Sequence, residues 1–141
     1  VNNPDAKLKS SILDGSALEK FRQLVSAHGG SLTSLDNPEM HKPLFSKEVR
    51  AKKDGYISYM DTLGIGMAVV YLGGGHLQKG DVLDPTVGVK FHKKIGDLVH
   101  KGEPMIEYFC SDKYKFENSK LYLEEAIQIN SERPELTELI Y

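Results

Sequence analysis

Residues 51–76 read AKKDGYISYMDTLGIGMAVVYLGGGH, and this stretch decides the expected fold. Its first part predicts a turn at Lys53-Asp54-Gly55 and then a strand over Tyr56–Met60. Asp61 can cap a short helix, and the run Gly73-Gly74-Gly75 brings that helix to an end. On this helix, the spacing places Leu63, Met67 and Val70 on one face, with Ala68 and Leu72 beside it. A strand, a helix and a glycine stop within so short a stretch indicate a mixed structure.

Short strands are expected on both sides of this stretch. The candidates are Leu44–Ala51, Val82–Leu83, Thr86–His92 and Met105–Phe109. Turns at Lys79-Gly80-Asp81, Ile95-Gly96-Asp97 and Lys101-Gly102-Glu103 separate the later ones, and ten of the thirteen glycines lie between Gly55 and Gly102. We therefore predict an α+β fold rather than a doubly wound α/β sheet.

The C-terminal part is expected to hold one more amphipathic helix, over about 114–129. Its inward positions would be Phe116, Leu123, Ala126 and Ile127. Pro134 prevents further continuation of the helix. Residues 136–141 then have the composition to add one edge strand.

The N-terminal part predicts a different organisation. The first ten residues show no apolar periodicity and are expected to be a mobile lead-in. Ser16-Ala-Leu-Glu19 has the form of a capping box. An apolar face then follows at Ala17, Phe21, Leu24, Val25 and His28, and Gly29-Gly30 stops the helix. Turn chemistry at Asp36-Asn37-Pro38 indicates a boundary, so we predict one segment over 1–35 and a domain over 36–141.

Composition excludes several classes of protein. The chain has 141 residues, 40% of them hydrophobic, with a net charge of −2, as expected for about one globular domain. No apolar run is long enough to span a membrane, and the near-neutral charge argues against nucleic-acid binding through bulk charge. The single Cys110 excludes an internal disulfide and a cysteine-rich zinc site. With no signal-like N-terminus, a cytoplasmic location is the expectation.

No motif predicts a metal or phosphate site. The five histidines, His28, His41, His76, His92 and His100, include no pair at i, i+4 spacing and no HExxH motif. Gly64-Ile65-Gly66 opens a dinucleotide-binding pattern, but Val69 stands at the place of the third glycine. The glycines at 73–75 follow a helix, so the positive end of that helix does not face them. Helix termination with close chain packing is the favoured interpretation.

The other reactive side chains have structural interpretations. Cys110 follows an apolar strand and is expected to be a small buried residue. Asp81, Asp84 and Asp97 sit in turns, where aspartate bonds its own backbone. The basic pairs Lys52-Lys53 and Lys93-Lys94 are expected on solvated turns. The sequence thus predicts no catalytic, cofactor-binding or metal-binding residue in this chain.

Several ordered motifs together resemble the pyrimidine nucleoside phosphorylases, the family that includes thymidine phosphorylase. The run DGSALEKFRQLVSAHGG at 14–30 resembles a helix late in that family's chain. The later matches are AKKDGYI at 51–57, DTLGIG at 61–66, LGGGH at 72–76, DPTVG at 84–88, KIGD at 94–97 and KGEP at 101–104. The resemblance runs from about residue 12 to the C-terminus. It departs from the family at His76, where arginine is usual, and at His28, where glutamine is common.

The resemblance implies the C-terminal part of such an enzyme. It implies an α/β-hammerhead domain, akin to a barrel-sandwich hybrid, preceded by the last helix of a neighbouring α/β domain. The family reaction would be the phosphorolysis of a pyrimidine nucleoside to the free base and (deoxy)ribose 1-phosphate, with phosphate as co-substrate and no cofactor. Catalytic residues would lie upstream, so the isolated chain is expected to be inactive. The remaining domains would be its partners, in a homodimeric parent whose cleft closes by domain movement.

Two alternatives stay open. A biotinyl or lipoyl carrier has a similar fold, but Cys110 falls where the modified lysine of a carrier would be. The chain could also be a stand-alone binding or regulatory module. The first residue is Val1 rather than Met, which under the phosphorylase interpretation is expected to be a cut end. The sequence does not decide between thymidine and uridine, nor does it assign a role to His76.

Overall fold

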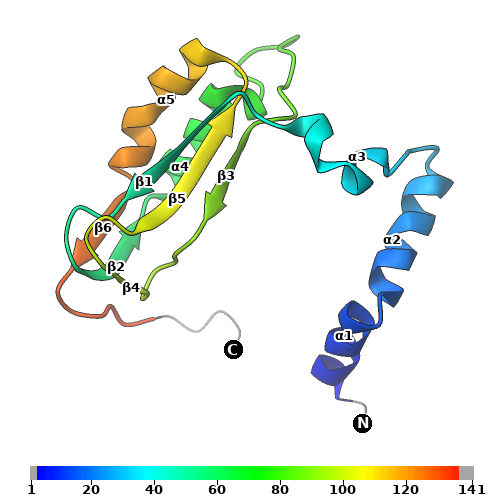
Figure 1. Ribbon diagram of the computed structural model, residues 1–141, viewed down its shortest axis with the longest axis horizontal. Helices are drawn as coiled ribbons and strands as arrows, with labels where there is room; N and C mark the ends of the chain where they lie inside the picture. Colours follow the sequence, from blue (N-terminus) through cyan, green and yellow to red (C-terminus); the bar gives the residue numbers. More distant parts are fainter. Residues whose placement is uncertain (1–2, 137–141) are drawn as a thin grey trace. The chain divides into compact units, whose positions relative to one another are not determined.

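The computed structural model describes residues 3–136 (Figure 1). These fall into two compact units that divide between His41 and Lys42. The division comes after the boundary predicted at residue 35, because short helical turns fill the expected linker: α3 spans Thr33–Asp36, and the 3-10 helix η1 spans Pro38–His41.

The first unit begins with a helix that the sequence did not predict. α1 spans Pro4–Leu13, so the expectation of a mobile lead-in there was wrong. The Asn3 side chain accepts hydrogen bonds from the N–H groups of Asp5 (3.1 Å) and Ala6 (3.4 Å), and Pro4 stands in the first turn. The capping signals at the start of α1 are therefore strong even though its apolar periodicity is weak.

The predicted second helix is confirmed, but its start is built differently. α2 spans Ser16–Ala27 and is preceded by Gly15, whose φ is 80°. No capping box forms: the Ser16 hydroxyl donates to the Ser11 carbonyl oxygen, while the Ser16 N–H donates to Asp14 Oδ1 at 2.9 Å. The sharp left-handed turn at Gly15 lets α2 follow α1 closely.

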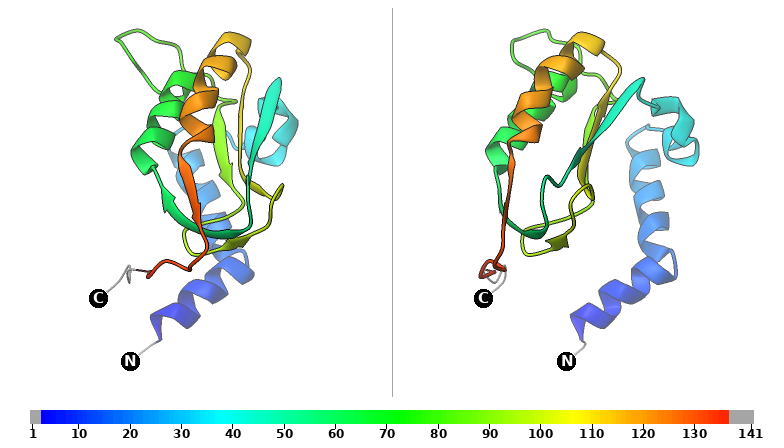
Figure 2. Two further views of the ribbon diagram at one scale, coloured as in Figure 1. Left: turned by 90° about the vertical axis from the view of Figure 1, so that its left-hand side faces the viewer. Right: turned by 60° about the vertical axis from the view of Figure 1, so that its left-hand side comes forward.

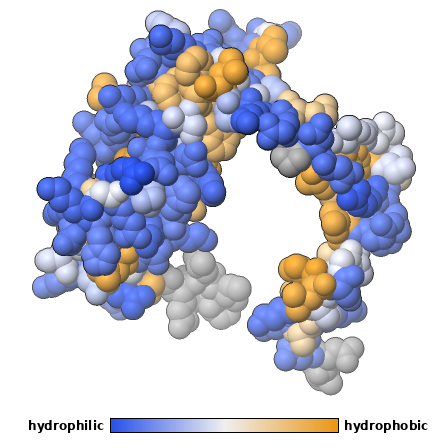
Figure 3. All heavy atoms as spheres, viewed as in Figure 1, coloured by the Kyte–Doolittle hydropathy of each residue, from blue (hydrophilic) through white to orange (hydrophobic). Residues whose placement is uncertain are grey.

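Helices α1 and α2 contain no buried residue. Their exposed large apolar residues are Leu8, Ile12, Leu13, Leu18, Phe21 and Leu24. Figure 3 shows apolar atoms gathered along this helical segment. Arg22 joins α2 to α3 through an ion pair with Asp36 (2.9 Å). This unit thus has an amphipathic helix without a core of its own.

In the second unit, successive strands alternate between two sheets. The strands are β1 (Phe45–Arg50), β2 (Gly55–Met60), β3 (Gly88–Phe91), β4 (Leu98–Val99), β5 (Pro104–Cys110) and β6 (Ile127–Asn130). One sheet has the order β1-β5-β3 and the other the order β4-β2-β6, and all pairings are antiparallel. The mixed α+β class is confirmed.

The strands β1 and β2 were predicted on either side of one turn, and both exist, but they do not pair with each other. Phe45 in β1 pairs with Cys110 in β5, whereas Tyr56 in β2 pairs with Asn130 in β6. The turn at residues 51–54 therefore carries the chain from one sheet to the other. Local turn chemistry does not distinguish such a crossing from a hairpin.

The first helix of this unit starts as predicted and buries another face. α4 spans Thr62–Val69, and Asp61 Oδ1 accepts a hydrogen bond from the Gly64 N–H at 2.9 Å. The buried positions of α4 and the following π-helix η2 (Val70–Gly74) include Ile65, Ala68 and Leu72. Leu63, which the spacing placed on one apolar face with Met67 and Val70, is 76% exposed. Apolar side chains surround this helix, so periodicity alone could not select its buried face.

The last predicted helix is a helix followed by a strand. α5 spans Lys113–Glu124, begins at the side-chain cap Asp112, and is followed by β6. Phe116 and Leu123 are buried as predicted, but extension of the helix to residue 129 was wrong. Val82–Leu83 is not a strand, and the short strand β4 was missed. Of the predicted edge strand, Leu136 is not in a strand, and residues 137–141 lie outside the described residues.

The core lies between the sheets and the two helices. Figure 2 shows α4 and α5 side by side along one flank of the strands. The largest fully buried side chains are Tyr108, Ile57, Leu72, Ile106, Leu123 and Val99. Within residues 3–136, no helix is long and apolar enough to cross a membrane.

Candidate functional site

Asp84 holds together three segments that are distant in the sequence. Its Oδ1 accepts hydrogen bonds from the Thr86 N–H (2.8 Å) and the Thr86 hydroxyl (2.6 Å). Its Oδ2 accepts one from the Ser111 N–H (3.1 Å), at the end of β5. The Asp84 N–H donates to the Gly73 carbonyl oxygen at 2.9 Å. The predicted bond from Asp84 to its own loop is confirmed, and the links to Ser111 and Gly73 add a structural junction.

The charge of Asp84 is stabilised by this junction. Burial disfavours its ionised form, but the hydrogen bonds from Thr86 and Ser111, together with nearby Lys115, outweigh burial and leave the pKa below its usual value of 3.8. All of these donors come from the chain itself. The carboxylate is therefore arranged as a structural acceptor rather than as a proton donor near neutral pH.

The glycine run is packed closely against its surroundings. Gly73 has a φ of 108°, and a methyl group placed on it would lie 3.0 Å from Lys115 Nζ. Methyl groups on Gly74 and Gly75 would approach Val69 and Val70 at 2.9 and 2.8 Å. These contacts support the interpretation as a helix stop with close packing.

The histidines are dispersed. His28 ends α2, and His41 ends η1. In the second unit, His92 Nε2 lies 3.8 Å from Glu107 Oε2, and His100 Nδ1 lies 3.8 Å from Asp54 Oδ1. Within the described part of the chain, no group of three His, Cys, Asp or Glu side chains could hold a metal ion.

Cys110 is the small buried residue that the sequence predicted. It is fully buried, and its thiol donates to the Asp112 carbonyl oxygen at 3.2 Å. Burial raises the pKa of the thiol, which disfavours the reactive thiolate. A prosthetic group attached at this position would have no access to solvent, which counts against the carrier interpretation.

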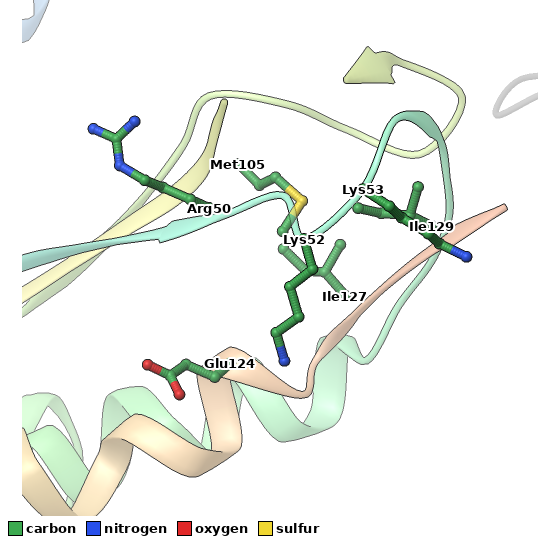
Figure 4. Close-up of a pocket in the computed structure, with 7 residues that line it drawn as sticks. All are labelled: Arg50, Lys52, Lys53, Met105, Glu124, Ile127 and Ile129. Carbon is green, nitrogen blue, oxygen red and sulfur yellow. The ribbon is translucent and has the colours of Figure 1, made fainter. Parts of the chain in front are cut away.

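A small pocket of about 220 Å³ lies beside the 51–54 turn (Figure 4). Its apolar lining is Met105, Ile127 and Ile129, and its charged lining is Arg50, Lys52, Lys53 and Glu124. Figure 4 shows Lys52 extending toward α5, whereas Arg50 and Lys53 point away from each other. The Arg50 guanidinium donates to the Gly102 carbonyl oxygen at 2.6 Å and pairs with Glu48. The cations therefore do not converge on one anion.

Glu124 at this pocket belongs to a link between helix and sheet. Its Oε1 lies 2.8 Å from Lys47 Nζ in β1 and 3.9 Å from Lys120 Nζ in α5. The hydrogen bond from Lys47, opposed by partial burial and aided by nearby lysines, holds the pKa of Glu124 below its usual value. Sequence reasoning missed this pair, because its two members are brought together only by the packing of α5 on β1.

Two buried hydroxyls were also missed. Tyr108 and Ser119 are both fully buried, and neither hydroxyl has a hydrogen-bond partner among the described residues. The Tyr108 ring stacks on Phe116 with centroids 4.9 Å apart. No sequence signal separates such a tyrosine from one with a paired hydroxyl.

Together, these features define a class: a small α+β domain in which the polar clusters of the described residues hold the fold together. A family model described as "Pyrimidine nucleoside phosphorylase C-terminal domain" matches residues 56–130, from β2 to the end of β6. The chain therefore belongs to the pyrimidine nucleoside phosphorylase family and corresponds to its C-terminal domain.

Curated relatives agree with this membership. A pyrimidine-nucleoside phosphorylase from Geobacillus stearothermophilus is 33% identical over 135 residues, which are 95% of this chain and 31% of the relative. One from Staphylococcus aureus (strain USA300) is 40% identical over 102 residues, 72% of this chain and 24% of the relative. The chain thus spans a third or less of the length of these relatives.

Proposed function

We propose that this chain is the C-terminal part of a pyrimidine nucleoside phosphorylase, an enzyme that cleaves pyrimidine nucleosides with phosphate into the base and (deoxy)ribose 1-phosphate. The observation that carries the proposal is the family match over residues 56–130. It is supported by relatives whose names state this activity and of whose length the aligned region makes up 31% and 24%. Phosphate serves as co-substrate, and no cofactor is required.

The role of this piece is structural. Phosphorolysis needs cationic and hydrogen-bonding groups at both the phosphate and the leaving base. The polar clusters at Asp84 and Glu124 are satisfied by partners within the chain. The catalytic groups of the parent accordingly lie in its upstream domains. The C-terminal domain packs on them and supports closure of the cleft between domains.

The two units of the chain are assigned to two different domains of the parent enzyme. The alternation of strands between two sheets, with α4 and α5 beside them, supports the α/β-hammerhead form related to barrel-sandwich hybrids. α2 is the terminal helix of a neighbouring α/β domain, and its exposed Phe21 and Leu24 pack there in the parent enzyme. The parent is a cytoplasmic homodimer that binds neither nucleic acid nor membrane.

A domain exchange tests the proposal. The matching C-terminal region of the Geobacillus stearothermophilus relative is replaced by residues 12–141 of this chain. Thymidine and uridine phosphorolysis is then followed by chromatography of the released base. We expect activity in the exchanged enzyme, and none in this chain alone or in the relative truncated before the region. Activity of the isolated chain, or a folded but inactive exchanged enzyme, would contradict the proposal.

A further inference from the structure

The solvent side of α5 carries a second apolar stripe, opposite the side that faces the core. The buried residues of α5 are Phe116, Ser119 and Leu123. On the opposite face, the spacing i, i+4, i+7, i+8 and i+11 brings together Tyr114, Asn118, Leu121, Tyr122 and Glu125. Tyr114 is 79% exposed, Leu121 66% and Tyr122 49%. A helix with apolar side chains on two opposite sides is typical of a helix that is covered on both.

Two adjoining hollows follow this stripe, where α5 lies beside α4 and η2 (Figure 2). One, of about 530 Å³, lies between α5 and the start of α4. The other, of about 510 Å³, lies between α5 and the segment after α4, which contributes Tyr71 and Leu77. Both are lined by Asn118 and Tyr122, so together they form one groove, the α5 groove. The rings of Tyr71 and Tyr122 stack in it, with centroids 5.2 Å apart.

The α5 groove is poor in free charge. Asp61 and Asp112 line it, but each is a helix cap: Asp61 Oδ1 accepts from the Gly64 N–H at 2.9 Å, and Asp112 Oδ1 accepts from the Lys115 N–H at 3.0 Å. The remaining charged lining residues, Lys115 and Glu125, have opposite signs. Tyrosines with few free charges are typical of the centre of a protein interface. The groove therefore suits an apolar protein surface better than an ionic ligand.

The relatives indicate what occupies the groove. The aligned region makes up 31% of the Geobacillus stearothermophilus relative and 24% of the Staphylococcus aureus relative, so the larger part of each enzyme lies outside it. The matching family model describes a C-terminal domain, so that larger part precedes the domain in such an enzyme.

We propose that the α5 groove is the face on which the preceding part of the parent phosphorylase docks, through an apolar segment that contacts Tyr114, Leu121 and Tyr122. Docking removes these apolar side chains from water, and the tyrosine hydroxyls keep the capacity to bond polar groups of the partner. This inference rests on the proposed function and names the docking face that the proposed function leaves open.

Nitration of tyrosines tests the docking face in the exchanged enzyme, in which residues 12–141 of this chain replace the matching region of the Geobacillus stearothermophilus relative. Tetranitromethane modifies accessible tyrosines, and mass spectrometry follows each one. Tyr59 on β2 is the matched control, because it lies outside the groove and is 49% exposed, as Tyr122 is. We expect Tyr114 and Tyr122 to react roughly fivefold more slowly in the exchanged enzyme than in this chain alone, because a docked domain excludes the reagent. Tyr59 should react equally in both.

The activity of the exchanged enzyme reports on the proposed function, and nitration reports on the docking face. An active enzyme whose Tyr114 and Tyr122 stay as reactive as in the chain alone would overturn the docking face while the proposed function stands. A folded, inactive enzyme with both tyrosines protected would contradict the proposed function and support the docking face.

A charge placed in the groove gives a second readout. Leu121→Glu puts a carboxylate into the α5 groove, and Lys113→Glu is the matched control, because it puts one on the same helix outside the groove. Both positions are exposed, so we expect both variants of this chain alone to keep its midpoint of thermal unfolding. In the exchanged enzyme, Leu121→Glu should speed unfolding about tenfold, since docking would bury an unpaired charge, and Lys113→Glu should have little effect. Equal unfolding rates of the two variants would contradict docking at the groove.

Nitration of this chain alone separates the other possible occupants. If Tyr114 and Tyr122 react faster on dilution, a second copy of the chain covers the groove. If both react more slowly than Tyr59 at every concentration, the chain covers the groove itself. Either result would overturn the proposal.

Discussion

At the scale of single residues, the Asp84 carboxylate accepts three hydrogen bonds, from Thr86 and Ser111. Asp84→Asn replaces one carboxylate oxygen with an N–H donor, which then faces the N–H of Ser111 or the donors of Thr86. We expect a loss of about 1–3 kcal/mol in the free energy of unfolding. Urea titration followed by circular dichroism measures it. Asp97→Asn is the matched control, since it changes an exposed turn in which the Asp97 side chain accepts, among the described residues, only from the Lys94 N–H.

The pKa of Asp84 predicts a pH dependence as well. Because this pKa is lowered in the folded chain from its usual 3.8, the stabilisation is present above about pH 4 and is lost as the pH falls through the folded value. Urea titrations at pH 7 and pH 3 should therefore show a smaller drop in stability for Asp84→Asn than for the unchanged chain. An identical drop would mean that Asp84 is not ionised preferentially in the fold.

Removal of the buried hydroxyl of Tyr108 or Ser119 is expected not to lower the stability of the fold, in contrast to Asp84→Asn. Since neither hydroxyl has a hydrogen-bond partner within residues 3–136, Tyr108→Phe and Ser119→Ala remove an unsatisfied polar group and keep most of the packing. We expect each change to leave the midpoint of thermal unfolding unchanged or to raise it, by up to about 1 kcal/mol in stability. A loss greater than about 1 kcal/mol would show that the hydroxyl is bonded in solution.

At the scale of elements, Gly73 and Gly66 form a matched pair on one helical segment. Gly73 is left-handed and crowded by Lys115, whereas a methyl group on Gly66 meets nothing within 4 Å. Gly73→Ala should cost about 1–3 kcal/mol, and Gly66→Ala should be neutral or stabilise by about 0.5–1 kcal/mol. Thermal unfolding of both variants measures the difference. Equal effects would contradict the conformational origin of the glycine stop.

The link between Lys47 of β1 and Glu124 of α5 predicts a measurable coupling. The two side chains are 40% and 30% exposed, so solvent weakens their attraction. A double-mutant cycle with Lys47→Met and Glu124→Gln should give a coupling of about 0.5–1 kcal/mol that falls as salt is added. A coupling that salt leaves unchanged would mean that the two residues act through packing.

The sequence predicted elements where the signal is local. Asp61 caps α4, and the glycines at 29–30 end α2, because capping depends on neighbours only. Pairing of strands depends on distant residues, so the crossing at residues 51–54 and the change from α5 to β6 were not predictable from periodicity. The same holds for the site. The turn role of Asp84 was predicted from its neighbours, while its bond to Ser111 depends on the position of β5.

At the scale of the whole molecule, the two units should differ in resistance to proteolysis. α1 and α2 bury no residue, whereas the second unit holds nearly all of the core. Limited digestion with proteinase K, which has little sequence preference, should therefore cut first within residues 1–41 and leave a stable fragment that begins near Lys42. Mass spectrometry identifies the fragment. Early cleavage within β1–β6 would contradict this order.

The alternation of strands between sheets has a consequence for how the domain folds. β1 pairs with β5, and β2 pairs with β6, and in each pair the second strand comes much later in the sequence. Neither sheet can therefore be completed before most of the chain has been synthesised. The two sheets are therefore expected to form in a single cooperative event governed by contacts of long sequence separation, which makes folding slow compared with a helical bundle of equal size. For the same reason, a cut between β2 and β5 is expected to leave two pieces that do not fold separately, because each piece would lack the pairing partners of its strands.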